Sequence, residues 1–141
     1  MEVREARTRE EILAAMALRQ RVFCEEQGVR PPEQSGIDGR VIHVVAFEAP
    51  GRLVGTCRLV VSHRLARLGW LAVEAEVRGR GAGAAILRQA ERAARGAGAY
   101  RVRLHARMAA LSLYERGGYV PRGETFVVEG IEHLTMEKAI A

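Results

Sequence analysis

The segment EVRGRGAGAAIL, residues 76–87, places two arginines and three glycines within six positions, Arg78 to Gly83. A run with helical spacing follows directly, although glycine is the poorest ordinary helix former after proline. The first turn of a helix offers unpaired N–H groups and the positive end of the helix dipole, and glycines let these groups approach a ligand closely. Between an apolar strand and a helix, these residue types favour a phosphate-binding turn. The alternative is a flexible turn whose glycines serve close packing.

The common phosphate motifs do not account for this turn. No Lys-Ser or Lys-Thr pair follows it, so it is not a Walker A loop, and the G-x-G-x-x-G spacing of dinucleotide-binding turns fails. The chain carries a net charge of +5, and all but one of its 22 basic residues are arginines, whose planar fork binds phosphates bidentately. Because the arginines are scattered among glutamates and aromatic residues make up only 5%, we favour a small phosphate-bearing ligand over nucleic acid.

Length and composition indicate a single globular domain over residues 1–141, with 48% hydrophobic and 28% charged residues. No apolar run approaches the roughly 20 residues that span a bilayer, and the charged N-terminus lacks the apolar core of a secretion signal. Cys24 and Cys57 lie inside apolar runs without metal-like spacing. We therefore expect buried thiols, no metal site, no membrane partner and a cytoplasmic location.

The elements that position the glycine turn alternate in a mixed α/β order. The residues between the first helix and the second strand, 25–40, are rich in glycine and proline and favour a loop. Apolar runs separated by turn residues predict strands, and helical spacing closed by glycines predicts helices. The expected strands span 2–6, 41–48, 52–63, 66–74 and 100–106, with two more in 119–140, and the expected helices span 10–23, 81–99 and 107–118.

Two helices show a clear pattern. In the first, Thr8 and Glu11 have the spacing of a capping box, and Ile12, Met16, Arg19 and Phe23 follow with helical spacing. In the long central helix, the spacing predicts a buried and an exposed face. The expected buried residues are Ile86, Leu87, Ala90, Ala93 and Ala94, and the expected exposed ones are Arg88, Glu91, Arg92 and Arg95.

Several segments, in order, resemble the GNAT superfamily of acyl-CoA N-acetyltransferases. Residues 78–83, RGRGAG, match its R/Q-x-x-G-x-G/A signature, with LAV (71–73) before it and LYERGGY (113–119) after it at the family's distance. The segments LRQRVFCEEQGV (18–29), GTCRL (55–59) and GIEHLTMEK (130–138), together with Asp38 and His43, are similar to the ElaA-like branch. The resemblance covers essentially the whole chain.

The resemblance implies an α/β fold with a mixed, largely antiparallel central sheet, splayed strands 4 and 5, and helices on both faces. It also implies acetyl-CoA as the acyl donor, entering the gap between those strands. The backbone of Leu71, Ala72 and Val73 would pair with the pantetheine amides. The pyrophosphate would be held chiefly by backbone N–H groups, with charge added by the arginines, in the segment Arg78, Gly79, Arg80, Gly81, Ala82, Gly83 and Ala84.

The same resemblance assigns catalytic roles in a direct attack of an amine on the thioester. Tyr114 stands where the family places the tyrosine that protonates the departing thiolate, and a backbone amide near Val73 would stabilise the oxyanion. Glu74 is our expected general base. His43, His105 and His133 are further candidates, and a water chain or no base at all fits equally.

The acceptor side is less defined. Glu26, Arg58 and His105 are the expected substrate-binding residues, and Gln27 and Asp38 match the branch pattern beside them. The family's helix often carries Asn seven positions before the tyrosine, where this chain has Arg107, and the usual closing Phe is Tyr119. The expected acceptor is a small-molecule or peptide amine, and a homodimer is compatible. The alternatives are an acyl-CoA-binding regulatory protein without turnover and an arginine-driven nucleic-acid-binding module.

Overall fold

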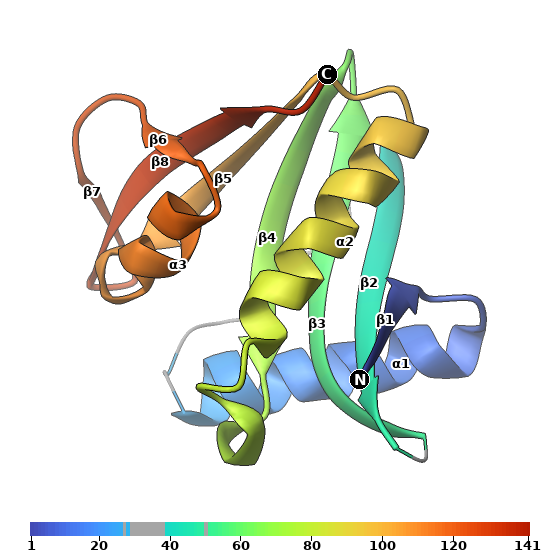
Figure 1. Ribbon diagram of the computed structural model, residues 1–141. Coiled ribbons are helices and arrows are strands. Elements are labelled where there is room, and N and C mark those ends of the chain that lie inside the picture. Colours follow the sequence, from blue (N-terminus) through green and yellow to red (C-terminus); the bar gives the residue numbers. More distant parts are fainter. Residues whose placement is uncertain (27, 29–38, 50) are drawn as a thin grey trace.

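The computed structural model (Figure 1) describes residues 1–26, 28, 39–49 and 51–141. These residues form one mixed sheet with the strand order β1-β2-β3-β4-β5-β8-β6, and β7 also pairs with β8. Within the described residues, β4 and β5 are the one parallel pair. The strands are β1 (Glu2–Glu5), β2 (Arg40–Glu48), β3 (Arg52–Ser62), β4 (Leu65–Val73), β5 (Arg101–Arg107), β6 (Val120–Pro121), β7 (Phe126–Val128) and β8 (Ile131–Ala139).

The sheet divides where β4 meets β5. The two strands pair from Leu65 opposite Arg101 to Leu68 opposite Leu104, and there the pairing ends. Beyond that point β4 continues beside β3 and β5 continues beside β8, so the strands diverge, as Figure 1 shows. The predicted splay of strands 4 and 5 and the largely antiparallel sheet are confirmed.

Helices cover both faces of the sheet, as predicted. Helix α2 (Ala82–Gly96) packs on one face, where α3 (Leu111–Arg116) joins it beside β5, and the main core lies between them and the strands. Helix α1 (Arg9–Arg19) covers the other face and continues into a π-helical segment, η1 (Gln20–Glu26). Two short 3₁₀ turns, η2 (Ala75–Val77) and η3 (Met108–Ala110), precede α2 and α3. None of the helices in the described ranges is long and apolar enough to cross a membrane.

One detail of the predicted helix faces is wrong. Glu91, expected outside, is 6% exposed because its carboxylate accepts hydrogen bonds from the Tyr119 hydroxyl (3.0 Å) and the Lys138 ammonium (2.9 Å). Met16, which shares a helical spacing with buried Phe23, is exposed. The π-helical segment that follows α1 changes the angular spacing between these two residues. The apolar residues predicted to be inside α2 are all buried.

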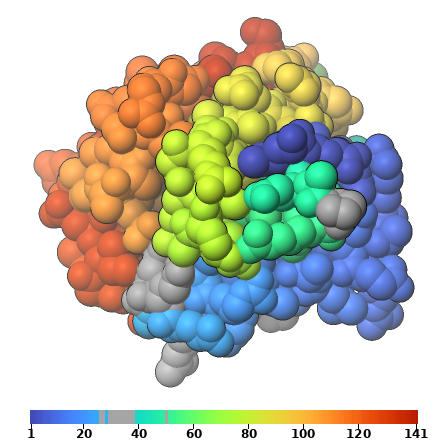
Figure 2. All heavy atoms as spheres, turned by 60° about the horizontal axis from the view of Figure 1, so that its bottom comes forward, coloured from blue at the N-terminus to red at the C-terminus, as the bar shows by residue number. Residues whose placement is uncertain are grey.

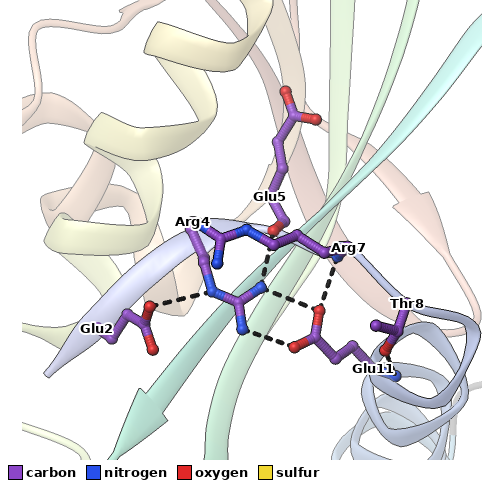
Figure 3. A network of polar contacts seen from close by, with 6 residues as sticks. All are labelled: Glu2, Arg4, Glu5, Arg7, Thr8 and Glu11. Carbon is purple, nitrogen blue, oxygen red and sulfur yellow. Dashed lines mark hydrogen bonds and ion pairs between the residues drawn. The ribbon is translucent and has the colours of Figure 1, made fainter.

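The closing segment also differs from the predicted pair of strands. It forms a two-residue strand β6 and a three-residue strand β7, which both pair with the long β8. At the other end of the chain, Thr8 caps α1 as expected, with its hydroxyl accepting from the Glu11 N–H. The Glu11 carboxylate binds the guanidinium of Arg4 and the N–H of Arg7 (Figure 3), which ties β1 to the start of α1. These contacts, with a smaller contribution from the Thr8 backbone N–H, hold the pKa of Glu11 below its usual value.

Candidate functional site

The divergence of β4 and β5 opens a cleft of about 860 Å³. Its walls come from β3, β4 and the start of α2 on one side and from α3, β5, β7 and β8 on the other. No carboxylate is among its lining residues in the described part of the chain, whereas its basic lining residues are Arg58, Arg67, Arg78, Arg103, Arg107, Arg116, His105 and His133. Such a cleft attracts anionic ligands, because its described lining residues include several arginines and no carboxylate.

The glycine turn forms one end of this cleft. Gly81 is the N-cap residue of α2 at a φ of 83°, Gly79 has a φ of 80°, and no side chain caps the helix. The first N–H groups of α2 are therefore left for a ligand. A Cβ at Gly79 or Gly81 would meet no atom within 4 Å, so the left-handed backbone, and not crowding, calls for glycine. In Figure 2 this segment (yellow-green) lies at the surface between the segment with α3 (orange) and the end of β2 (turquoise).

The two arginines of the turn differ in place. The Arg78 side chain lines the cleft, and its Nε donates to the carbonyl oxygen of Val73 at 2.9 Å, which links the turn to the end of β4. Arg80 is exposed and is not among the lining residues. Gly79, Gly81, Ala82, Gly83 and Ala84 all line the cleft, as do Leu71, Ala72 and Val73 of β4.

A β-bulge in β4 was not predicted from the sequence. The β3–β4 register shifts between Thr56 and Arg58, and Trp70 has a φ of 57°, a left-handed conformation that is uncommon for a bulky residue. The bulge follows the point at which β4 leaves β5, so it bends the strand edge that faces the cleft. The only sequence signal for it is Gly69 inside an otherwise apolar strand.

Tyr114 on α3 lines the cleft and is 7% exposed. Its hydroxyl has no hydrogen-bond partner in the described residues, in contrast to the hydroxyl of Tyr119, whose ring centroid lies 6.0 Å away. Burial, with a smaller contribution from the nearby Cys57 thiol, raises the pKa of Tyr114 to about 12, and Arg107 partly offsets this shift. The phenol is therefore a neutral donor at physiological pH.

Glu74, our expected base, lies just after β4 but is not among the cleft-lining residues. Its carboxylate pairs with the guanidinium of Arg21 on η1 at 2.5 Å. Glu26 is the last residue of η1, and its side chain, like Gln27 and Asp38, lies outside the described part of the structure. The predicted roles of these three residues in acceptor binding therefore remain predictions.

The histidines occupy different places. His105 and His133 line the cleft on either side of the Phe126 ring, with centroid distances of 5.0 and 5.7 Å. Burial, His133 and Arg103 lower the pKa of His105, so its imidazole is neutral at pH 7. His43 does not line the cleft; its Nδ1 accepts from Arg19 at 2.9 Å, and burial beside two arginines lowers its pKa to about 4.

The structure thus brings together most of the residues expected to form the site. The cleft gathers the β4 backbone, the glycine turn, Arg78, Tyr114, Arg58 and His105, and leaves out Glu74 and Arg80. Sequence reasoning noted Arg107 only as a departure from the family pattern. It lines the cleft close enough to affect the Tyr114 hydroxyl electrostatically.

Comparison with known proteins shows what this arrangement is similar to. The acetyltransferase (GNAT) domain family matches residues 6–140. An uncharacterized N-acetyltransferase of Bacillus subtilis, YjcF, is 30% identical over 135 residues, covering 94% of this chain and 96% of the relative. An acyl-CoA N-acyltransferase from Pseudomonas aeruginosa is 27% identical with a TM-score of 0.83, covering 98% of this chain and 97% of that one. Escherichia coli ElaA shares the fold at 20% identity and a TM-score of 0.84, covering 97% and 98%.

Proposed function

Because the chain belongs to the acetyltransferase (GNAT) family, whose members use acetyl-CoA, we propose that it acetylates a primary amine by direct attack on the thioester. One observation carries this proposal: the cleft between β4 and β5 leads from an unpaired strand edge to an uncapped helix N-terminus. The acceptor is a small-molecule or peptide amine.

The residues of the cleft fit the donor. Beyond Leu68, the edge of β4 that faces β5 has lost its strand partner, so the backbone of Leu71, Ala72 and Val73 is available to pair with the amides of a pantetheine chain. The N–H groups of the segment from Gly79 to Ala84 would hold the pyrophosphate at the start of α2. Arg78 would add charge and would keep the turn against Val73.

Tyr114 would act at the leaving group. Tyr114 lines the cleft, and its hydroxyl has no hydrogen-bond partner in the described ranges, so it can donate to the sulfur as the C–S bond breaks. A backbone N–H near Val73 would stabilise the negative charge that develops on the thioester oxygen. Glu74 is held by Arg21 and would have to leave that ion pair to act as a base. His105 lines the cleft with a neutral imidazole, and we propose it as the alternative acceptor of the amine proton.

Release of free thiol from acetyl-CoA in the presence of a panel of primary amines tests the proposal. We expect amine-dependent release, with the acetylated amine identified by mass spectrometry. The control is the same reaction without amine, which measures hydrolysis. If acetyl-CoA raises the melting temperature but no amine causes thiol release, the protein binds acetyl-CoA in a regulatory role and does not transfer the acetyl group. Binding of nucleic acid that weakens steeply with salt, with no effect of acetyl-CoA on the melting temperature, would overturn the donor site itself.

A further inference from the structure

Arg58 on β3 is buried and has no partner among the described residues. The residue is 7% exposed, lines the cleft, and makes no hydrogen bond or ion pair with any described part of the chain. Its Nε is fully shielded from solvent and unsatisfied. A buried guanidinium normally lies against a carboxylate or a set of carbonyls, because desolvating an unpaired charge is costly. In the described part of the chain, no anion lies against the Arg58 guanidinium.

Arg58 lies beside the place where β4 and β5 begin to diverge. Across β3 and β4, Arg58 lies opposite Gly69, the first residue of β4 after its pairing with β5 ends at Leu68. A Cβ on Gly69 would meet no atom within 4 Å, so the space beside Arg58 is open. Val73 lies opposite Gly55, three residues from Arg58 along β3 and roughly 10 Å away at 3.3 Å per residue. Arg58 is thus well separated from the glycine turn, which the pyrophosphate would occupy.

Two other arginines lie near Arg58 and differ from it in their partners and in their access to the cleft. Arg19 lies beside it, is 2% exposed, and donates to neutral acceptors, the His43 ring and the Cys57 carbonyl among them, while its buried Nε and Nη1 have no hydrogen-bond partner in the described residues. Arg19 does not line the cleft, so of these two guanidinium groups Arg58 is the one that a ligand in the cleft can reach. Arg103, further along the cleft, is already paired with Glu137 at 2.6 Å. One free guanidinium in this position matches a singly charged carboxylate, which it can bind bidentately.

Apolar side chains adjoin this charge. Trp70 follows Gly69 on β4, and its ring contacts the ring of Phe23 edge to face, with centroids 4.7 Å apart. Val22 of η1 and Val60 of β3 also line the cleft. An occupant with a carboxylate at Arg58 can therefore place an apolar group against these side chains.

We propose that the acceptor is an amino acid-like molecule, a primary amine that carries a carboxylate a few bonds away, and that Arg58 binds this carboxylate. The inference rests on the proposed acetyl transfer and specifies its substrate class. The amine nitrogen forms the new N–C bond with the thioester carbon as the C–S bond breaks. The nitrogen loses one proton to His105 or water, and the sulfur leaves as a thiolate that accepts a hydrogen bond from the Tyr114 hydroxyl. Arg58 holds the acceptor and takes no part in the proton transfers.

Amines that differ only in their carboxylate test whether the enzyme recognises this group or accepts any primary amine. L-phenylalanine and L-leucine are compared with their decarboxylated twins, 2-phenylethylamine and 3-methylbutylamine, and with their amides, by thiol release at saturating acetyl-CoA. The amides have the less basic amine and so the larger neutral fraction, which would make them the best substrates if only the free amine mattered. We expect the reverse, with kcat/KM for the amino acids higher by roughly 10- to 150-fold, the factor that a hydrogen bond to a charged group contributes. Equal acetylation of all three classes would overturn the proposal and leave acetyl transfer standing.

The variant Arg58→Gln tests the residue. We expect kcat/KM for the amino acids to fall by the same factor, while the decarboxylated twins change less than threefold. Arg9→Gln, which removes one positive charge from the exposed start of α1, is the control and should change neither. Because Arg58 is unpaired, its removal should leave the melting temperature equal or higher, which also checks that the variant folds. A loss shared by both substrate classes in a folded variant would contradict a carboxylate-specific role.

A binding measurement decides the matter without turnover. N-acetyl-L-phenylalanine and its amide are titrated calorimetrically into the protein saturated with CoA. We expect the carboxylate to bind at least tenfold more tightly than the amide, and this preference to vanish in Arg58→Gln. Absence of an Arg58-dependent preference overturns the proposal. If the carboxylate binds more tightly than the amide but no amine causes thiol release, acetyl transfer is overturned and the carboxylate-binding site at Arg58 stands.

Discussion

Removing only the hydroxyl of Tyr114, by Tyr114→Phe, should reduce turnover without affecting folding. The hydroxyl has no hydrogen-bond partner in the described residues, so its loss should change the free energy of unfolding by less than about 0.5 kcal/mol. Tyr119 provides the matched control, because its hydroxyl donates to buried Glu91 at 3.0 Å. Tyr119→Phe should cost about 1–2 kcal/mol of stability and leave kcat unchanged.

The size of the effect on kcat follows from the pKa of Tyr114. Burial raises this pKa to about 12, whereas a free thiol titrates near 8.5, so complete proton transfer to the thiolate is uphill by roughly 5 kcal/mol. The hydroxyl therefore acts mainly by a hydrogen bond to the charge that develops on sulfur. Such a bond supplies up to about 3 kcal/mol, which places the expected loss at the lower end of general acid catalysis, roughly 100-fold in kcat.

Steady-state kinetics with acetyl-CoA and an accepted amine measure this loss. It should appear in kcat more than in KM, because the hydrogen bond strengthens in the transition state. Because the pKa of Tyr114 is about 12, this phenol stays protonated below about pH 11. Its ionisation should therefore cause no loss of kcat in the wild type below that pH, and Tyr114→Phe should remove none. A kcat within threefold of wild type in a folded Tyr114→Phe variant would refute the role. So would a decline near pH 9 that this substitution abolishes.

Three further predictions concern the charges around the cleft. Arg80→Ala should change the Kd for CoA less than threefold at physiological salt, because the side chain is exposed and does not line the cleft; a larger change would show that side-chain charge holds the pyrophosphate. Burial lowers the pKa of His43 to about 4 from 6.5, so the unfolded chain binds the proton first as the pH falls and stability should drop by about 1–2 kcal/mol between pH 7 and pH 5. Urea unfolding at both pH values tests this, and His43→Gln should flatten the dependence. Glu74→Gln breaks the ion pair with Arg21 and should reduce kcat less than tenfold if Glu74 positions η1, whereas a loss above 100-fold at high pH would identify it as the base.

The order of elements and the position of the glycine turn could be predicted because each depends on local sequence. The glycines of residues 79–83 mark a strand-to-helix turn through their backbone requirements, and Tyr114 follows at a fixed place in the next helix. The apolar face of α2 follows from helical spacing alone. These features need no knowledge of which segments meet in space.

The features that were missed depend on contacts between distant segments. The left-handed Trp70 lies where the register between β3 and β4 shifts, a feature that depends on how two strands meet and not on the local residue types. Glu91 is buried because Tyr119 and Lys138 reach it across the fold. The pairing of Glu74 with Arg21 joins residues 53 positions apart, so the sequence could not show that the expected base has a partner.

Calorimetric titration of acetyl-CoA into the wild type, Gly81→Val and Gly98→Val shows whether acetyl-CoA binds at the start of α2. Gly81 and Gly98 flank the two ends of α2, with φ of 83° and 91°, and a Cβ at either meets nothing within 4 Å. Valine therefore costs a similar backbone strain at both sites, roughly 1–3 kcal/mol, but only Gly81 belongs to the proposed pyrophosphate cradle. We expect one molecule of acetyl-CoA to bind the wild type and Gly98→Val, and binding to Gly81→Val to be lost while circular dichroism shows it folded. Equal binding to both variants, or no binding to the wild type, would contradict an acetyl-CoA site at the start of α2.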